Sequence, residues 1–144
     1  AGSDTIGGTL GISQSTLDGL QFASGFPGSL NCSVVDVDGN DTYSFTNMIL
    51  SSSFDASTGA YTADFAGTIT DSTLGTFSVA TQQSFAGIDP GDPNAGVAKV
   101  TASDSSSVTM TVLDGINVQL EIDSDGDGVT DATINTTWTV LNNT

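Results

Sequence analysis

Apolar residues recur at every second position over most of this chain. The clearest runs are VTMTV at 108–112 and VQLEI at 118–122. The intervening positions are mostly Thr, Ser, Asn or Asp, which is typical of strands with one face in a core and the other in water. The same alternation predicts a last strand through Ile134, Trp138 and Val140, with Trp138 in the core. Turn signals separate the runs at 36–41, 55–59, 89–96, 102–107 and 113–115.

The composition gives little support for helices. The chain has one Glu, one Lys and no Arg with which to build an exposed helical face. Its 144 residues have room for one domain with a core of its own. We therefore predict a single all-β domain over residues 1–144, an antiparallel β-sandwich of about eight to ten strands with little or no helix. A β-barrel is the alternative architecture.

The charge of the chain is strongly one-sided. The formal net charge is −16, Lys99 is the only cationic side chain and no histidine is present. Phosphate backbones and anionic membrane surfaces are repelled by such a chain, so we expect no nucleic-acid partner. We also expect no membrane insertion, because no apolar run approaches the roughly 20 residues of a membrane span. Cations are the natural partners.

The side-chain inventory also argues against catalysis. Without His or Arg, and with one Cys and one Lys, the serine, thiol and phosphoryl-transfer arrangements are missing. Paired carboxylates remain, but a glycosidase needs two of them facing each other across a cleft, and the aspartates here cluster in turns. We therefore expect no enzymatic activity.

One segment carries a specific metal-binding pattern. In EIDSDGDGVTDATI, carboxylates stand at positions one, three, five and nine of a loop that starts at Asp123. Calcium takes six to eight oxygen ligands, and alternating short carboxylates on a tight loop converge on one point. An EF-hand is excluded, because its twelfth position needs Glu and this chain has Ile134. The predicted Ca²⁺ ligands are the carboxylates of Asp123, Asp125, Asp127 and Asp131 and the backbone carbonyl of Val129. The other interpretation is a solvated acidic turn.

This segment resembles the DxDxDGxxD calcium loops that join strands in integrin-type propellers and related extracellular modules. In such loops the ninth-position aspartate, here Asp131, closes the cage. The chain from Thr81 onward also resembles a β-region of secreted and surface lipoproteins of Gram-negative bacteria. The residues that carry this resemblance are Thr81, Phe85, Pro93, Gly96, the Ser105–Ser107 turn, Val118, the aspartate loop, and Thr136, Thr137 and Trp138. These resemblances imply an exported β-domain with a bound cation, located outside the cell or at its surface, and imply no reaction.

A second, weaker candidate lies in VVDVDGNDTYSF. Asp36, Asp38 and Asn40 occupy positions one, three and five of a similar loop, but Asp41 replaces the glycine expected at position six. The alternative is an ordinary hairpin turn, because Asp-Gly between apolar strands is a common signal for one.

The N-terminal stretch DTIGGTLGIS offers a clue to assembly. Ile6, Gly8, Leu10 and Ile12 alternate with small polar residues. Residues 1–13 are therefore either an ordinary strand of the domain or a donor strand that pairs with a neighbouring subunit. Two functions remain open: a calcium-binding subunit of a surface fibre that self-associates by strand addition, or a calcium-dependent module that binds carbohydrate or a cell surface.

Overall fold

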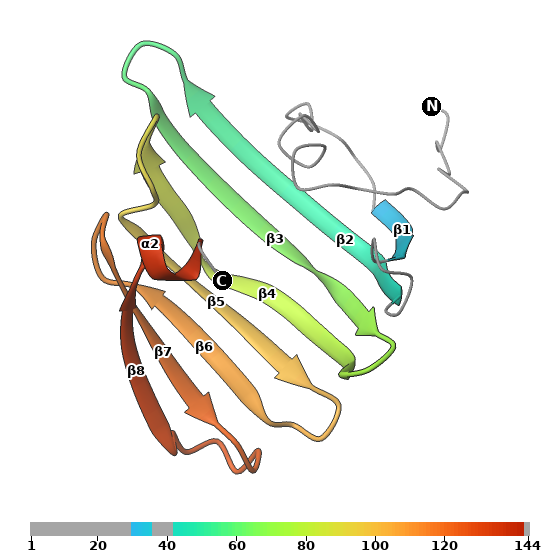
Figure 1. The fold of residues 1–144 in the computed structure, drawn as a ribbon. Coiled ribbons are helices and arrows are strands. Elements are labelled where there is room, and N and C mark those ends of the chain that lie inside the picture. The colour runs from blue at the N-terminus through green and yellow to red at the C-terminus, as the bar shows by residue number, and fades with distance from the viewer. Residues whose placement is uncertain (1–29, 36–41, 143–144) are drawn as a thin grey trace.

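The computed structural model describes residues 30–35 and 42–142, and these residues form one antiparallel sheet (Figure 1). A single turn of helix, α2 (Trp138–Leu141), follows the last strand. The strands are β1 (Leu30–Val35), β2 (Thr42–Asp55), β3 (Ala60–Asp71), β4 (Gly75–Ile88), β5 (Ala95–Ala102), β6 (Ser107–Val112), β7 (Asn117–Asp123) and β8 (Ala132–Thr137).

Each strand pairs with its neighbours in sequence, in the order β1-β2-β3-β4-β5-β6-β7-β8. The prediction of an all-β, antiparallel fold with about eight strands and almost no helix is thereby confirmed. The strands that the structure describes lie in one open sheet, whereas a sandwich has two packed sheets and a barrel closes on itself. The physical reason is that the described connections, from β2 onward, are three to eight residues long, and short connections place consecutive antiparallel strands side by side in the same sheet.

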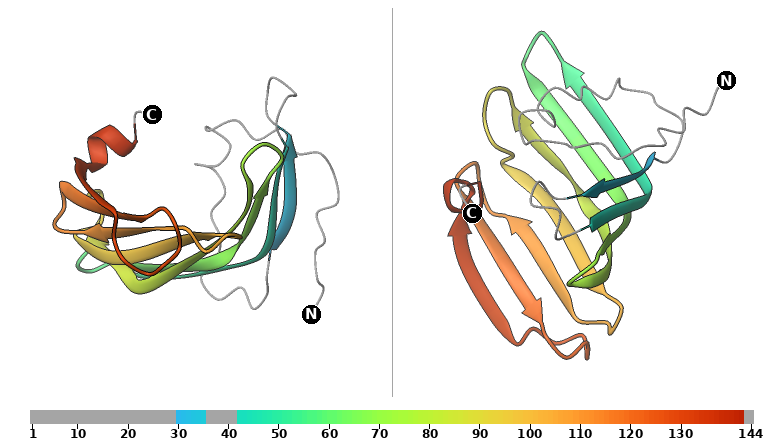
Figure 2. Two further views of the ribbon diagram at one scale, coloured as in Figure 1. Left: turned by 90° about the horizontal axis from the view of Figure 1, so that it is seen from below. Right: turned by 45° about the vertical axis from the view of Figure 1, so that its right-hand side comes forward.

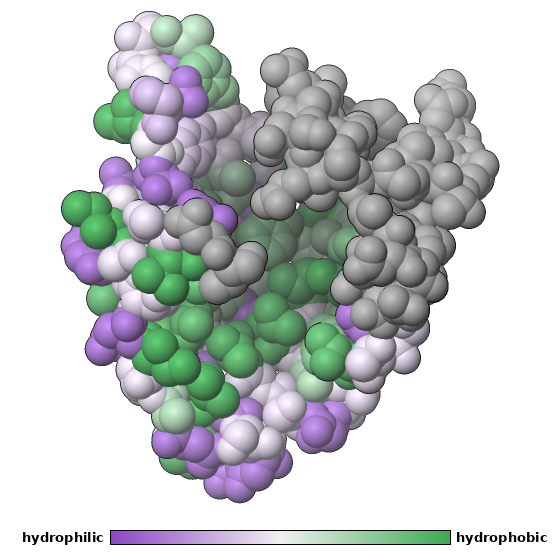
Figure 3. All heavy atoms as spheres, viewed as in Figure 1, coloured by the Kyte–Doolittle hydropathy of each residue, from purple (hydrophilic) through white to green (hydrophobic). Residues whose placement is uncertain are grey.

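The sheet is bent into a trough, with α2 on its concave side (Figure 2). Register brings apolar residues of successive strands together on this concave face, and Figure 3 shows them gathered in the hollow. The convex face carries the polar partners, including Lys99, Thr109 and Glu121, which are aligned across three strands. One concave row runs from β4 to β8 through Val79, Val100, Val108, Ile122 and Ala132.

A small core lies on the concave face under α2. Phe85, Ala98 and Val112 are buried there, and the rings of Phe65 and Phe85 stack with centroids 5.7 Å apart. Trp138 packs against this cluster, and its indole N–H donates to the Pro93 carbonyl at 3.1 Å. The prediction that Trp138 belongs to the core is confirmed.

The prediction of a strand continuing through Val140 is wrong, because β8 ends at Thr137. The Thr137 hydroxyl accepts from the Val140 N–H at 3.4 Å and caps the helical turn that follows. This helical turn places Trp138 against the core. In the residues that the structure describes, no helix is long and apolar enough to cross a membrane.

Aspartates begin most of the hairpin turns, as the turn signals predicted. The Asp55 carboxylate accepts from Ser57 and Thr58, and that of Asp71 accepts from the Thr73 and Leu74 N–H groups at 2.6 and 2.7 Å. Such bonds satisfy turn N–H groups that lack a ladder partner. The carboxylates of Asp104 and Asp114 accept in the same way, from Ser106 and from Ile116 and Asn117.

Gly96 is required where β5 passes under the core. Its φ is +145°, and a Cβ there would lie 2.9 Å from the Phe85 Cα. We predict that Gly96→Ala lowers the free energy of unfolding by about 2–3 kcal/mol through backbone strain and overpacking, measured by urea denaturation. Gly115→Ala is the matched control, since the nearest atom to its Cβ would be 4.0 Å away. Equal losses in the two variants would contradict this interpretation.

Acid should weaken the turns. The Asn117 side-chain amide, followed by the Asn117 and Ile116 N–H groups, holds the pKa of Asp114 below its ordinary value. A carboxyl with a depressed folded pKa stabilises the fold above its unfolded pKa, and loses that contribution as pH falls through the folded pKa. The stability advantage of the wild type over Asp114→Asn should therefore be present at about pH 6 and shrink at about pH 3, measured by urea denaturation with chelator. An advantage that is equal at both pH values would refute this linkage.

Candidate metal site

The predicted calcium loop connects β7 to the edge strand β8. Gly126 and Gly128 have φ of +76° and +86°, which other residues rarely adopt. A Cβ on Gly126 would lie 2.9 Å from the Ser105 Cβ, so the loop also packs closely against the β5–β6 turn. Two glycines thus allow the chain to curl tightly between the two strands.

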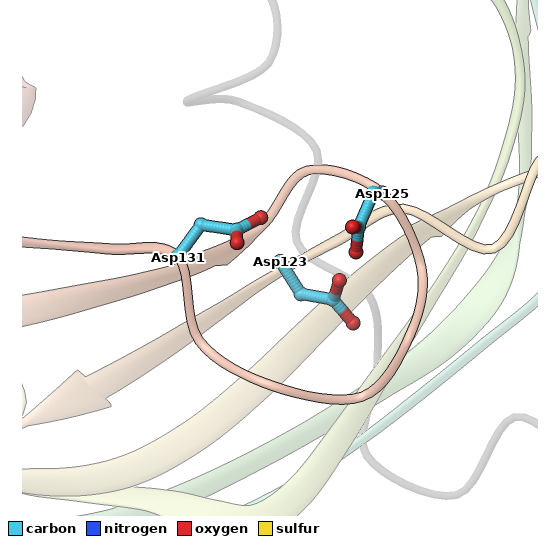
Figure 4. A group of neighbouring side chains, drawn as sticks. All are labelled: Asp123, Asp125 and Asp131. Atoms are coloured by element: carbon cyan, nitrogen blue, oxygen red, sulfur yellow. The ribbon is translucent and has the colours of Figure 1, made fainter.

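Three carboxylates meet inside this loop. Figure 4 shows Asp123, Asp125 and Asp131 pointing toward a common centre. Each offers a carboxylate oxygen, and these oxygens lie within 4.8 Å of one another. Oxygens bound to one Ca²⁺ at roughly 2.4 Å can be at most about 4.8 Å apart, so the spacing allows a shared cation. This group can hold a metal ion.

The loop's own hydrogen bonds fix two of these carboxylates. Asp123 is buried at the end of β7, and its two oxygens accept from the Gly126 and Gly128 N–H groups at 2.8 and 3.0 Å. One Asp131 oxygen, Oδ2, accepts from the Ser124 N–H at 2.7 Å and from the Ser124 hydroxyl at 2.5 Å. The Ser124 hydroxyl, then its N–H, holds the pKa of Asp131 below its ordinary value. Asp131 is therefore ionised at neutral pH and ready to bind a cation.

The donor set suits a hard cation. A carboxylate oxygen has more than one lone pair, so both Asp123 oxygens keep acceptor capacity beyond their single N–H bonds. The Asp125 Oδ1 accepts only a 3.2 Å bond, from the Asp127 N–H, among the contacts of this loop. Carboxylate-only sites favour Ca²⁺, Mg²⁺ or Mn²⁺ over softer metals. Neither Lys nor Arg occurs between positions 117 and 137 to neutralise the cluster.

The structure groups three of the four predicted aspartates. The Asp127 carboxylate is not part of the cluster and instead accepts from the Val129 N–H at 2.8 Å. The use of the Val129 carbonyl as a ligand stays a prediction. Asp36, Asp38 and Asn40, the second candidate site, lie outside the described residues, as do residues 1–13.

Ser124 is a site residue that the carboxylate spacing did not reveal. It orients Asp131 through two hydrogen bonds across seven positions of the chain. The available signal was a hydroxyl residue directly after the first aspartate, because Ser readily bonds to nearby carboxylates and turn backbone.

An apolar hollow of about 310 Å³ adjoins the cluster on the concave face. Its apolar lining includes Phe77, Val100 and Ile122, and Asp123 belongs both to the lining and to the acidic group.

Comparisons with protein-family models, with curated proteins and with solved structures find no match to this chain.

Proposed function

We propose that this protein is a calcium-binding structural module located outside the cell, and a subunit of an assembly that grows by β-strand addition. The observation that carries the proposal is the convergence of Asp123, Asp125 and Asp131 in the loop between β7 and β8. Calcium is the proposed ion because tight loops of alternating carboxylates suit its flexible, oxygen-rich coordination.

Calcium at this position would rigidify an edge of the sheet. Asp123 ends β7, and Asp131 immediately precedes β8, so one ion would bind both ends of the connection. The Asp131 N–H also donates to the Ile122 carbonyl at 2.8 Å, which holds the start of β8 against β7. The bound ion would fix the position of the edge strand.

That edge is suited to strand addition. β8 is the last strand of the sheet order and pairs only with β7 among the described strands. The backbone N–H of Trp138 donates to the Ile116 carbonyl, which continues the β7–β8 register by one pair. Backbone bonding alternates along an antiparallel strand, so the Thr133 and Asn135 N–H groups face away from β7. An unpaired edge of this kind is a template for another strand, and residues 1–13 have the alternation of a donor.

The hollow beside the cluster favours a second candidate function. A calcium-dependent binding module would use the ion and the adjoining apolar surface together, because Asp123 lies at both. Such a module would remain monomeric and would be retained on a glycan or cell surface only with calcium. The assembly proposal predicts polymer instead.

Calcium should raise the melting temperature of the wild type, and chelation should reverse the effect, because the ion binds the folded state. We predict that Asp125→Asn abolishes most of this calcium-dependent shift in calorimetry, since it removes one of the three converging charges. Asp127→Asn should reduce the shift less.

Asp104→Asn is the matched control for charge. It removes one negative charge from the neighbouring turn but keeps Oδ1, the oxygen that accepts both bonds from Ser106. Its calcium response should equal that of the wild type. If the melting curve of the wild type does not respond to calcium, the site is disproved. If Asp125→Asn and Asp104→Asn lose the calcium-dependent shift equally, calcium only screens the charge of the chain.

Strand addition is tested by sedimentation in calcium. The intact protein should sediment as polymer, and the variant lacking residues 1–13 as monomer. Asn135→Pro should also yield monomers, because it removes an outward-facing N–H while the backbone bonds to β7 remain. Of the bonds between the two strands it removes the one that the Gln119 side-chain amide donates to the Asn135 side chain. The Asn135→Pro variant should keep its calcium-dependent melting shift, and this result would show that the edge is blocked while the fold is intact. Monomeric wild type in calcium would contradict the assembly role.

A further inference from the structure

The concave face of the sheet is apolar and only partly covered. Val100 and Ile134 lie on it at 38% and 47% exposure, and Leu50 and Phe54 continue it onto β2 at 43% and 60%. The paired rows from β4 to β8 that form its floor contain no charged side chain. Within the described residues, α2 and Trp138 cover only the core around Phe85. An apolar sheet face of this extent needs a cover.

The chain itself contains one suitable cover. Beyond the described residues lie three segments: 1–29, 36–41 and 143–144. Residues 143–144 are too short to cross the sheet, and 36–41 hold three aspartates in six residues. Residues 14–29 carry a single charge, Asp18, together with the apolar side chains Leu17, Leu20, Phe22 and Phe26.

Length and position agree with this choice. The segment leads directly into Leu30, the first residue of the edge strand β1. Eight strands about 4.8 Å apart span roughly 34 Å, and 16 extended residues reach about 53 Å. The segment can therefore cross the trough from β1 toward β8. A second copy is a poorer cover, because residues 14–29 are already attached to β1, whereas a second copy would have to bind from solution.

We propose that residues 14–29 lie across the concave face of the same molecule and complete its core. The leucines and phenylalanines of the segment contact the row that contains Val100 and its neighbours. This arrangement leaves residues 1–13 free to reach another subunit, but it depends on neither calcium nor assembly.

Photo-crosslinking in the full-length protein tests this arrangement. The photoreactive residue p-benzoylphenylalanine replaces Val100 on the concave face or, as the matched control, Thr101 on the same strand with its side chain on the opposite face. After irradiation with chelator present, cleavage before aspartates releases residues 4–17 and 18–35 as separate peptides for mass spectrometry. Position 134 with its neighbour 135 provides a second pair, in case the substitution at 100 prevents folding.

The expected result is a crosslink within the monomer to residues 14–29, several-fold more abundant from Val100→p-benzoylphenylalanine than from the Thr101 variant. Dimer-sized products would assign the face to a second copy and overturn the proposal. Equal yields from both faces, or no peptide crosslink from either concave position, would overturn it as well. Because the test runs without calcium, its outcome is separable from that of the metal site.

Discussion

Repulsion among three carboxylates is the constraint on which the C-terminal part of this structure depends. Asp123, Asp125 and Asp131 offer oxygens within 4.8 Å of one another, in a chain whose only cationic side chain lies on β5. Like charges at such separations oppose the loop geometry unless a proton or a cation offsets them. The hydrogen bonds from Ser124 lower the pKa of Asp131 and so oppose protonation. A bound cation would offset this repulsion, and the three carboxylates are placed so that they can hold one.

Four other aspartates show what this residue does in a turn where no second carboxylate lies close to it. Those at 55, 71, 104 and 114 each begin a hairpin turn and accept from groups two or three residues ahead. Their spacing along the chain keeps them in separate turns. Each of these four charges is therefore part of how one hairpin is closed, whereas the β7–β8 loop brings three carboxylates together. The candidate cation site uses the same turn chemistry, because Asp123 also accepts from N–H groups a few residues ahead.

Sequence alone predicted the strands and turns well, because both depend on local pattern. The runs at 108–112 and 118–122 became β6 and β7 with little change of boundary. The alternation specifies which residues share a face but not what packs on that face, so a sandwich and a single trough look alike in sequence. Trp138 shows the same limit, since its apolar character predicted a core position and its phase with Val140 wrongly predicted a strand. Likewise, carboxylate spacing located the loop but could not show that Asp127 would bond to Val129.

The central claim is that one cation binds at Asp123, Asp125 and Asp131, and a calcium titration followed by amide NMR tests it most directly. The account predicts saturable shifts concentrated in residues 123–132, strongest at Gly126 and Gly128, whose N–H groups bond to Asp123. Smaller shifts should occur at Ser105, which the loop contacts. Weak, unsaturated shifts spread equally over all the aspartate turns would contradict it, because they would show that calcium only screens the charge of the chain.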